Sequence, residues 1–140
     1  MLCPWADALY AMDRVWWDKY HTRLKKEFSG ALFTCMSGCY SAIHAPVHHY
    51  HNSGAGVIAL AAYLGVKRVI MLGYDMQHTG GKTHWHGDHP KGLANAGKVN
   101  KWPVQFDYLK NNLGDVEIIN ASSVSALTCF KRVSLDEALA

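Results

Sequence analysis

The chain has 140 residues, of which 49% are hydrophobic and 18% are charged, and its formal net charge is +3 at pH 7. This balance excludes an intrinsically disordered chain, which combines low hydrophobicity with a high net charge, and the length predicts a single domain. The basic residues occur as isolated pairs instead of a dense stripe, so we expect no nucleic-acid partner. No apolar run approaches the roughly 18 residues of a membrane span, so we expect no membrane partner either.

Apolar residues alternate along the chain between strand-like and helix-like spacing. The predicted elements are, in chain order, a strand at residues 8–12, a helix at 14–28, a strand at 31–35, a helix at 54–64, a strand at 67–73, a helix at 103–113, a strand at 116–120 and a short helix at the C-terminal end. Residues 36–51 and 74–102 lack a sustained period and are predicted to be loops. A loop as long as the second is uncommon in a compact domain and is usually functional or disordered.

Several residues mark the predicted ends of these helices. Asp13 and Ser53 are suited to cap the first two helices, because their side-chain oxygens accept hydrogen bonds from unpaired backbone N–H groups. Gly30 is placed to end the first helix. Ser134 with Glu137 forms a capping-box pattern that begins the last helix.

The alternation of strands and helices predicts an α/β fold. We expect one domain over residues 1–140, with a mostly parallel sheet of about four strands covered by helices on both faces. In such sheets a ligand binds at the carboxyl ends of the strands, near the point where the strand order reverses. The segments after Cys35, Gly73 and Asn120 are therefore expected at the ligand edge.

The cysteines and the first residues bear on the cellular compartment. The four cysteines form neither a CxxC pair nor a recognisable disulfide framework, and the opening residues lack the basic and apolar regions of a signal peptide. We therefore expect reduced thiols and a cytoplasmic location.

The segment Asn52-Ser53-Gly54-Ala55-Gly56 opens a predicted helix. Backbone N–H groups and the helix dipole at such a start favour an anion, which indicates a phosphate or nucleotide site. The structural alternative is an ordinary capped helix whose glycines pack closely on the sheet.

The stretch 84–89 spells H-x-H-x-D-H within the long loop. Imidazoles and carboxylates are zinc ligands, so one hypothesis is a zinc-dependent hydrolase; no histidine follows His89 to complete its ligand set. A single metal ion on His84, His86 and His89 is a second hypothesis. A third, which we favour, is a polar active-site loop in which one histidine acts as an acid or base. The upstream histidines His44, His48, His49 and His51 could contact the same ligand or a metal, but an exposed loop is the simpler interpretation.

Three stretches, at residues 4–17, 52–76 and 120–139, carry a resemblance that spans nearly the whole chain. They resemble a Rossmann-like superfamily that contains bacterial sialyltransferases of the Campylobacter type and hydroxymethylpterin diphosphokinase-like proteins, and above all its uncharacterised phage and prophage members. The resemblance implies a nucleotide-dependent transferase of phage or prophage origin, similar to a glycosyltransferase or a pyrophosphokinase.

The same resemblance implies roles for particular residues. A nucleotide or sugar nucleotide would contact Asn52, Ser53, Gly54, Ala55 and Gly73. His89 in Gly87-Asp88-His89 is the candidate general base, Asp75 is the candidate carboxylate for a magnesium ion, and His86 is a further catalytic candidate. Zinc is not expected as a cofactor.

The sequence also departs from that family. Gln77 stands where the sialyltransferases have a tyrosine that assists the leaving phosphate, which argues against sialyl transfer itself. The printed chain begins after the position of the family's first strand and its Gly-Pro-Ser loop, so we expect a truncated Rossmann-like domain whose uncovered sheet is met by a second copy or another partner. A non-catalytic phage binding or assembly module that keeps the fold is therefore the alternative function.

Overall fold

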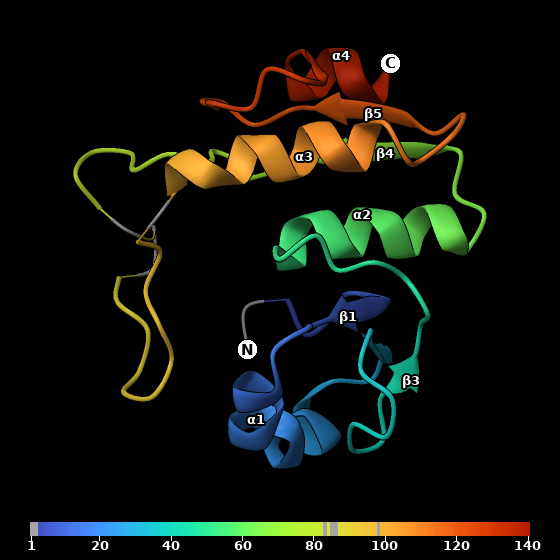
Figure 1. The fold of residues 1–140 in the computed structure, drawn as a ribbon, viewed down its shortest axis with the longest axis vertical. Coiled ribbons are helices and arrows are strands. Elements are labelled where there is room, and N and C mark those ends of the chain that lie inside the picture. Colours follow the sequence, from blue (N-terminus) through green and yellow to red (C-terminus); the bar gives the residue numbers. More distant parts are fainter. Residues whose placement is uncertain (1–2, 83, 85–86, 98) are drawn as a thin grey trace.

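The computed structural model describes residues 3–82, 84, 87–97 and 99–140. Within these ranges helices and strands alternate along the chain, as Figure 1 shows. The elements are β1 (Ala8–Tyr10), α1 (Arg14–Glu27), β2 (Ala31–Thr34), β3 (Ile43–His44), α2 (Ser53–Tyr63), β4 (Arg68–Met71), the 3-10 helix η1 (Val99–Lys101), α3 (Trp102–Lys110), β5 (Glu117–Asn120), β6 (Lys131–Arg132) and α4 (Leu135–Leu139).

The strands form two small sheets, ordered β1-β2-β3 and β4-β5-β6. Within each sheet, neighbouring strands pair in parallel. The expected α/β class and the parallel strands are confirmed. The expected single sheet of about four strands is not what the described residues form. Two of their strands, β3 and β6, are only two residues long, too short to leave a hydrophobic period in the sequence, and they exist because they pair with β2 and β5.

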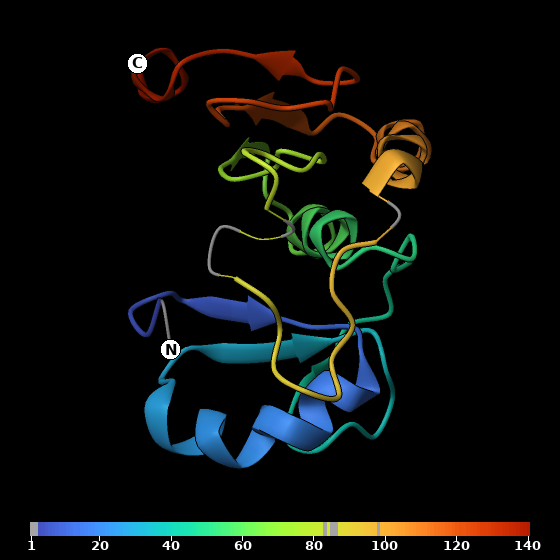
Figure 2. The ribbon, with the colours of Figure 1, turned by 90° about the vertical axis from the view of Figure 1, so that its left-hand side faces the viewer.

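Helix α2 lies between the two sheets in both Figure 1 and Figure 2. It contacts β1 below it and α3 beside it. Gly56 allows the close contact between α2 and β1. A Cβ on this residue would stand 2.7 Å from the Tyr10 hydroxyl, so only glycine lets α2 approach β1 this closely. The hydroxyl of Tyr10 is itself buried without a hydrogen-bond partner among the described residues.

Each sheet has its own hydrophobic core. The larger one joins α2, α3 and β4 around the fully buried Phe106 and Leu109, with Ile58 and Met71 beside them. The smaller one centres on Trp17 of α1, whose indole N–H donates to the Ala11 carbonyl at 3.0 Å.

The helix ends lie close to their predicted positions, but some of the residues expected to cap them do not make the capping hydrogen bonds. The capping box at α4 is confirmed, because Ser134 accepts from the Glu137 N–H and Glu137 accepts from the Ser134 N–H. Asp13 stands at the N-cap of α1, but its side chain makes no capping hydrogen bond there. Gly30 does not end α1, which closes at Glu27; instead it lets β2 pass close to the backbone before β1.

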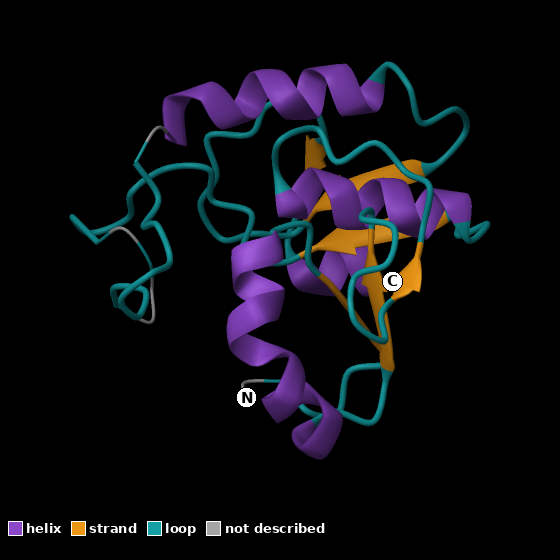
Figure 3. Cartoon of the chain, turned by 60° about the horizontal axis from the view of Figure 1, so that its bottom comes forward, coloured by secondary structure: helices purple, strands orange, loops and turns teal. Residues whose placement is uncertain are grey.

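The long segment between β4 and α3 extends to one side of the strands, as Figure 3 shows, and its described residues include an isolated antiparallel bridge between Thr79 and Lys82. Across the described ranges, no helix is long and apolar enough to cross a membrane. The four cysteines form no disulfide.

Candidate functional site

The start of α2 is capped by Asn52, not by Ser53 as the sequence suggested. Asn52 has an extended backbone, and its side-chain oxygen accepts from the N–H groups of Gly54 at 2.9 Å and Ala55 at 3.2 Å. Ser53 is the first helical residue. The N–H groups of Gly54 and Ala55, two of those that a phosphate at this helix start would use, are therefore already bonded within the protein. Among the described residues of this helix start, the Ser53 N–H and hydroxyl are the groups that a ligand can still use.

The end of β4 is joined to this helix start by Tyr74. The Tyr74 hydroxyl donates to the carbonyl oxygen of Gly54 at 3.1 Å, and burial raises the pKa of Tyr74 to about 12. Its ring lies so close that a Cβ on Gly54 would meet it at 3.0 Å. Tyr74 therefore remains protonated at neutral pH, and its hydrogen bond to Gly54 joins the end of β4 to the start of α2.

A buried polar network after β5 holds Tyr74 in place. Its backbone N–H donates to Ser122 Oγ at 2.8 Å, and its carbonyl accepts from Ser125 Oγ at 2.6 Å. The fully buried Asn120 orients both serines, since its amide donates to Ser125 Oγ at 3.0 Å and accepts from the Ser122 N–H at 3.0 Å. Sequence reasoning missed this supporting role. The available signal was a polar Asn at the end of an apolar strand, followed by two serines.

Histidines of the long loop shape the loop itself. The backbone of buried Ala96 is held on both sides: its N–H donates to His84 Nε2 at 3.2 Å, and its carbonyl accepts from His78 Nε2 at 3.1 Å. The N–H of His89 donates to Asn95 Oδ1 at 2.7 Å. These contacts bring the rings of His84 and His89 into edge contact, with centroids 4.3 Å apart.

A cavity of about 680 Å³, hereafter the main cavity, lies where these segments meet. It lies at the carboxyl ends of β1 and β4, each of which is one edge strand of its sheet. The residues that border it include Met12, Asp13, Gly73, Tyr74 and Trp102. Of the residues singled out from the sequence, it is also bordered by Asn52, Ser53, Gly54, His84 and His89.

Other residues singled out from the sequence lie elsewhere. Ala55 is fully buried behind the helix start. Asp75 borders a neighbouring hollow of about 350 Å³ and accepts a hydrogen bond from the Thr79 hydroxyl at 3.2 Å. His86 lies outside the described residues.

The upstream histidines build the turn that leads into α2. His48 Nδ1 accepts from the Tyr50 N–H at 3.0 Å, and His49 Nδ1 accepts from the His51 N–H at 2.9 Å. Both Tyr50 and His51 have a φ of 53°, the left-handed region that non-glycine residues seldom adopt, so these bonds stabilise an unusual backbone. Of the four upstream histidines (His44, His48, His49 and His51), His51 is the one that borders the main cavity.

This turn predicts a loss of stability in mild acid. Burial, with additional repulsion from His51 and His48, lowers the pKa of His49 below its ordinary value of 6.5. The unfolded chain therefore binds more protons than the folded one as pH falls from 7 toward 5, and the free energy of unfolding falls by less than about 1.4 kcal/mol per pH unit for this group. Urea unfolding at pH 7, 6 and 5 measures the slope.

His49→Asn isolates this contribution, because an amide oxygen can accept the same N–H without titrating. Its unfolding free energy should depend less on pH than that of the unmodified protein, whereas Ser41→Ala, at an exposed position without a titrating group, should not change the slope. Equal slopes in all three proteins would show that His49 does not contribute.

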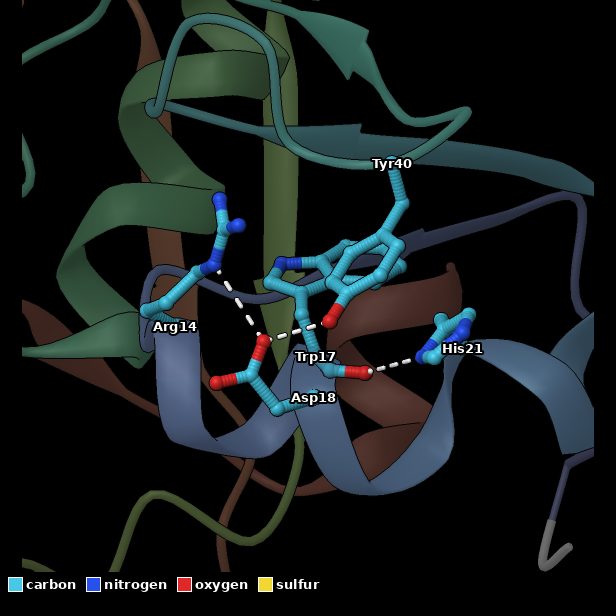
Figure 4. Close-up of polar contacts among 5 residues, drawn as sticks. All are labelled: Arg14, Trp17, Asp18, His21 and Tyr40. Carbon is cyan, nitrogen blue, oxygen red and sulfur yellow. Dashed lines mark hydrogen bonds and ion pairs between the residues drawn. The ribbon is translucent and has the colours of Figure 1, made fainter.

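A second polar cluster, on α1, is explained by structure alone (Figure 4). Asp18 accepts from Arg14 at 3.2 Å and from the Tyr40 hydroxyl, and His21 stacks on the Tyr40 ring with centroids 3.9 Å apart. His21 also donates to the Trp17 carbonyl at 3.0 Å. These contacts hold the loop after β2 against α1.

The main cavity combines groups that can bind an anion with groups that can move a proton. Ser53 offers a hydroxyl and a backbone N–H at a helix start, and His84 and His89 offer imidazoles. Among the described residues, no three histidine, cysteine or carboxylate side chains are grouped so that they could hold a metal ion. Comparison with known proteins found no match: no family model fits the chain, and no curated protein and no solved structure is significantly similar to it.

Proposed function

We propose that this chain is a nucleotide-dependent transferase, which moves a group from a phosphate-activated donor to a hydroxyl acceptor. The observation that carries the proposal is the main cavity, in which the start of α2 and two histidines of the long loop border one space. Ligands of doubly wound α/β proteins bind at such a carboxyl edge. The cavity volume of about 680 Å³ falls in the range of small-molecule sites.

Each group has one task in the proposed reaction. Ser53 binds a donor phosphate through its hydroxyl and backbone N–H. His89 accepts the proton of the acceptor hydroxyl, the acceptor oxygen bonds to the transferred group, and the bond between that group and the donor phosphate breaks. His84, whose Nε2 is occupied by the Ala96 N–H, orients the loop that carries His89. A general base of this kind contributes roughly 10²–10⁴-fold to a rate.

The strand order supports a Rossmann-like interpretation of the fold. Placed edge to edge, β3-β2-β1 and β4-β5-β6 give the doubly wound order 3-2-1-4-5-6, with the main cavity at the reversal point. On this proposal the two sheets are parts of one Rossmann-like domain of phage or prophage origin in which β1 and β4 adjoin, and the outer edge strands β3 and β6 are the ones open to a second copy or another partner.

Magnesium fits the proposal to a limited degree. Asp75 follows β4 and offers one carboxylate in the hollow beside the main cavity. Magnesium in nucleotide sites commonly uses one or two carboxylates together with substrate phosphates, so Asp75 would hold the ion only with the donor present, where it neutralises phosphate charge.

One observation favours the alternative, a non-catalytic binding or assembly module. The Asn52 side chain already takes the N–H groups of Gly54 and Ala55, so the helix start offers a phosphate fewer donors than an uncapped one. The two functions differ in whether a nucleotide binds at all.

The first test is donor binding. A thermal-shift panel of nucleoside diphosphates and sugar nucleotides, with and without magnesium, should raise the unfolding midpoint for at least one nucleotide class. A ligand at ten times its dissociation constant stabilises the native state by about 1.4 kcal/mol. Ser53→Ala should reduce the shift, and Ser123→Ala, at an exposed position outside the cavity, should preserve it.

The second test separates binding from chemistry. His89→Ala should keep the thermal shift of the responding nucleotide and lose turnover by about a hundredfold or more, whereas His44→Ala should keep both. No shift with any nucleotide at millimolar concentration would contradict the transferase and leave the binding module.

A further inference from the structure

A second cavity, hereafter the apolar cavity, shares His89 with the main cavity. Its volume is about 500 Å³. Much of its wall comes from β1 and α1, through Leu9, Trp16 and Tyr20, and from Phe28 just after α1. His89 and Leu93 of the long loop complete the wall. One imidazole therefore borders two cavities of different chemistry.

The loop wall of the apolar cavity is fixed to α1. Lys19 of α1 donates from its ammonium group to the carbonyl oxygen of Lys91 at 2.8 Å. Lys91 lies between His89 and Leu93, and the His89 N–H is held by Asn95 at 2.7 Å. Figure 2 shows the long loop reaching past α2 to α1. These two bonds hold the segment that carries His89, which borders both cavities.

The lining of the apolar cavity selects for an uncharged, mostly hydrocarbon ligand. Trp16 and Tyr20 present neighbouring rings with centroids 5.2 Å apart. Arg23, the cationic side chain that the described part of the wall contains, is paired with Glu27 at 2.8 Å. A sugar needs a hydrogen-bond partner for most of its hydroxyls, and this wall supplies few of them. Aromatic and aliphatic walls with a few polar groups are typical of sites for apolar small molecules.

We propose that the apolar cavity binds the acceptor, and that the acceptor is an apolar alcohol: a hydroxyl on an aryl or alkyl body. This inference rests on the proposed transferase function and names its second substrate. The hydrocarbon body lies against Trp16, Tyr20 and Phe28, and the hydroxyl points to His89. Its O–H bond breaks and the proton passes to His89, while its oxygen bonds to the transferred group and the donor phosphate leaves with the electrons of the broken bond.

The test is isothermal titration of the protein with 1-naphthol, without any donor. We expect saturable binding below millimolar concentration, and none with glycerol. Ala6→Phe narrows the cavity, and Tyr20→Ala removes a ring from its wall, so each should weaken naphthol binding by about tenfold or more. Tyr63→Ala, which removes an exposed tyrosine from α2, should leave it unchanged. Urea unfolding of each variant verifies that it is folded. If one of the two cavity variants does not fold, the other still tests the cavity.

The outcomes separate this inference from the proposed function, because naphthol binding needs no nucleotide. Absence of naphthol binding, or an affinity for naphthol that neither cavity variant lowers relative to the unmodified protein, overturns the acceptor site even if a nucleotide shifts the melting midpoint. Naphthol binding without any nucleotide shift overturns the acceptor role, because the donor is then lacking. Binding of both, with turnover of the aryl alcohol that His89→Ala abolishes, supports the proposal.

Discussion

Replacing Phe106 with alanine is expected to lower the free energy of unfolding by about 3–5 kcal/mol. Phe106 is fully buried in the larger core, and its ring meets those of Tyr74 at 5.8 Å and Phe130 at 6.5 Å between centroids. The substitution removes an aromatic side chain and leaves a cavity that the surrounding strands and helices cannot fill by small shifts. Urea unfolding, followed by far-ultraviolet circular dichroism, measures the loss.

The effect of Phe106→Ala should extend to the main cavity. Tyr74 packs on Phe106 and joins β4 to the start of α2, so loosening its ring should also weaken any nucleotide thermal shift. Val104 lies on the same helix with 67% of its surface exposed, and Val104→Ala should change the unfolding free energy by less than about 0.5 kcal/mol. Similar losses for the two variants would contradict the position of Phe106 at the centre of this core.

Replacing Gly30 with alanine is expected to cost about 2–3 kcal/mol. A Cβ at this position would lie 2.5 Å from the carbonyl oxygens of both Ala6 and Asp7. Those atoms belong to the backbone that enters β1, and the Asp7 oxygen also accepts from the Ala31 N–H at 2.8 Å. No side chain can move aside, so the methyl group must push β1 away from β2.

Gly97→Ala is the matched control, because a Cβ there meets no atom of the described residues within 4 Å. Its unfolding free energy should stay within about 0.5 kcal/mol of the unmodified protein. Hydrogen exchange adds a local measurement: in Gly30→Ala the Ala31 amide should exchange faster, whereas the amides of β5 should exchange at their original rates relative to global unfolding. Unchanged exchange at Ala31 would be incompatible with the close approach of the two strands.

Local patterns in the sequence were sufficient for the main elements. The apolar runs before Gly73 and around Ile119 are parallel strands, and the apolar spacing before Phe28 is a helix, because burying one face or a short run already restricts the backbone to these forms. The capping box at Ser134 was predictable for the same reason, since both of its partners lie within one helical turn.

Tertiary contacts decided where local patterns were ambiguous. Asn52 and Ser53 are adjacent and both suit a helix cap, and the extended backbone after the histidine turn gives the position to Asn52. The sequence predicts a helix stop at Gly30, but the position requires glycine because the backbone of Ala6 and Asp7 passes close to it in the folded chain. Strand β6 exists only because β5 pairs with it.

The candidate site divides in the same way. The sequence by itself predicted a capped helix start and a histidine-rich loop, each after a predicted strand, and Ser53 and His89 both border the main cavity. Only the tertiary structure decided that Asp75 borders a separate hollow, and that His84 and His78 hold Ala96. Only it decided, too, that the bond from Lys19 to Lys91 keeps His89 between two cavities. The physical reason is that these contacts join segments far apart in the chain, which no local periodicity records.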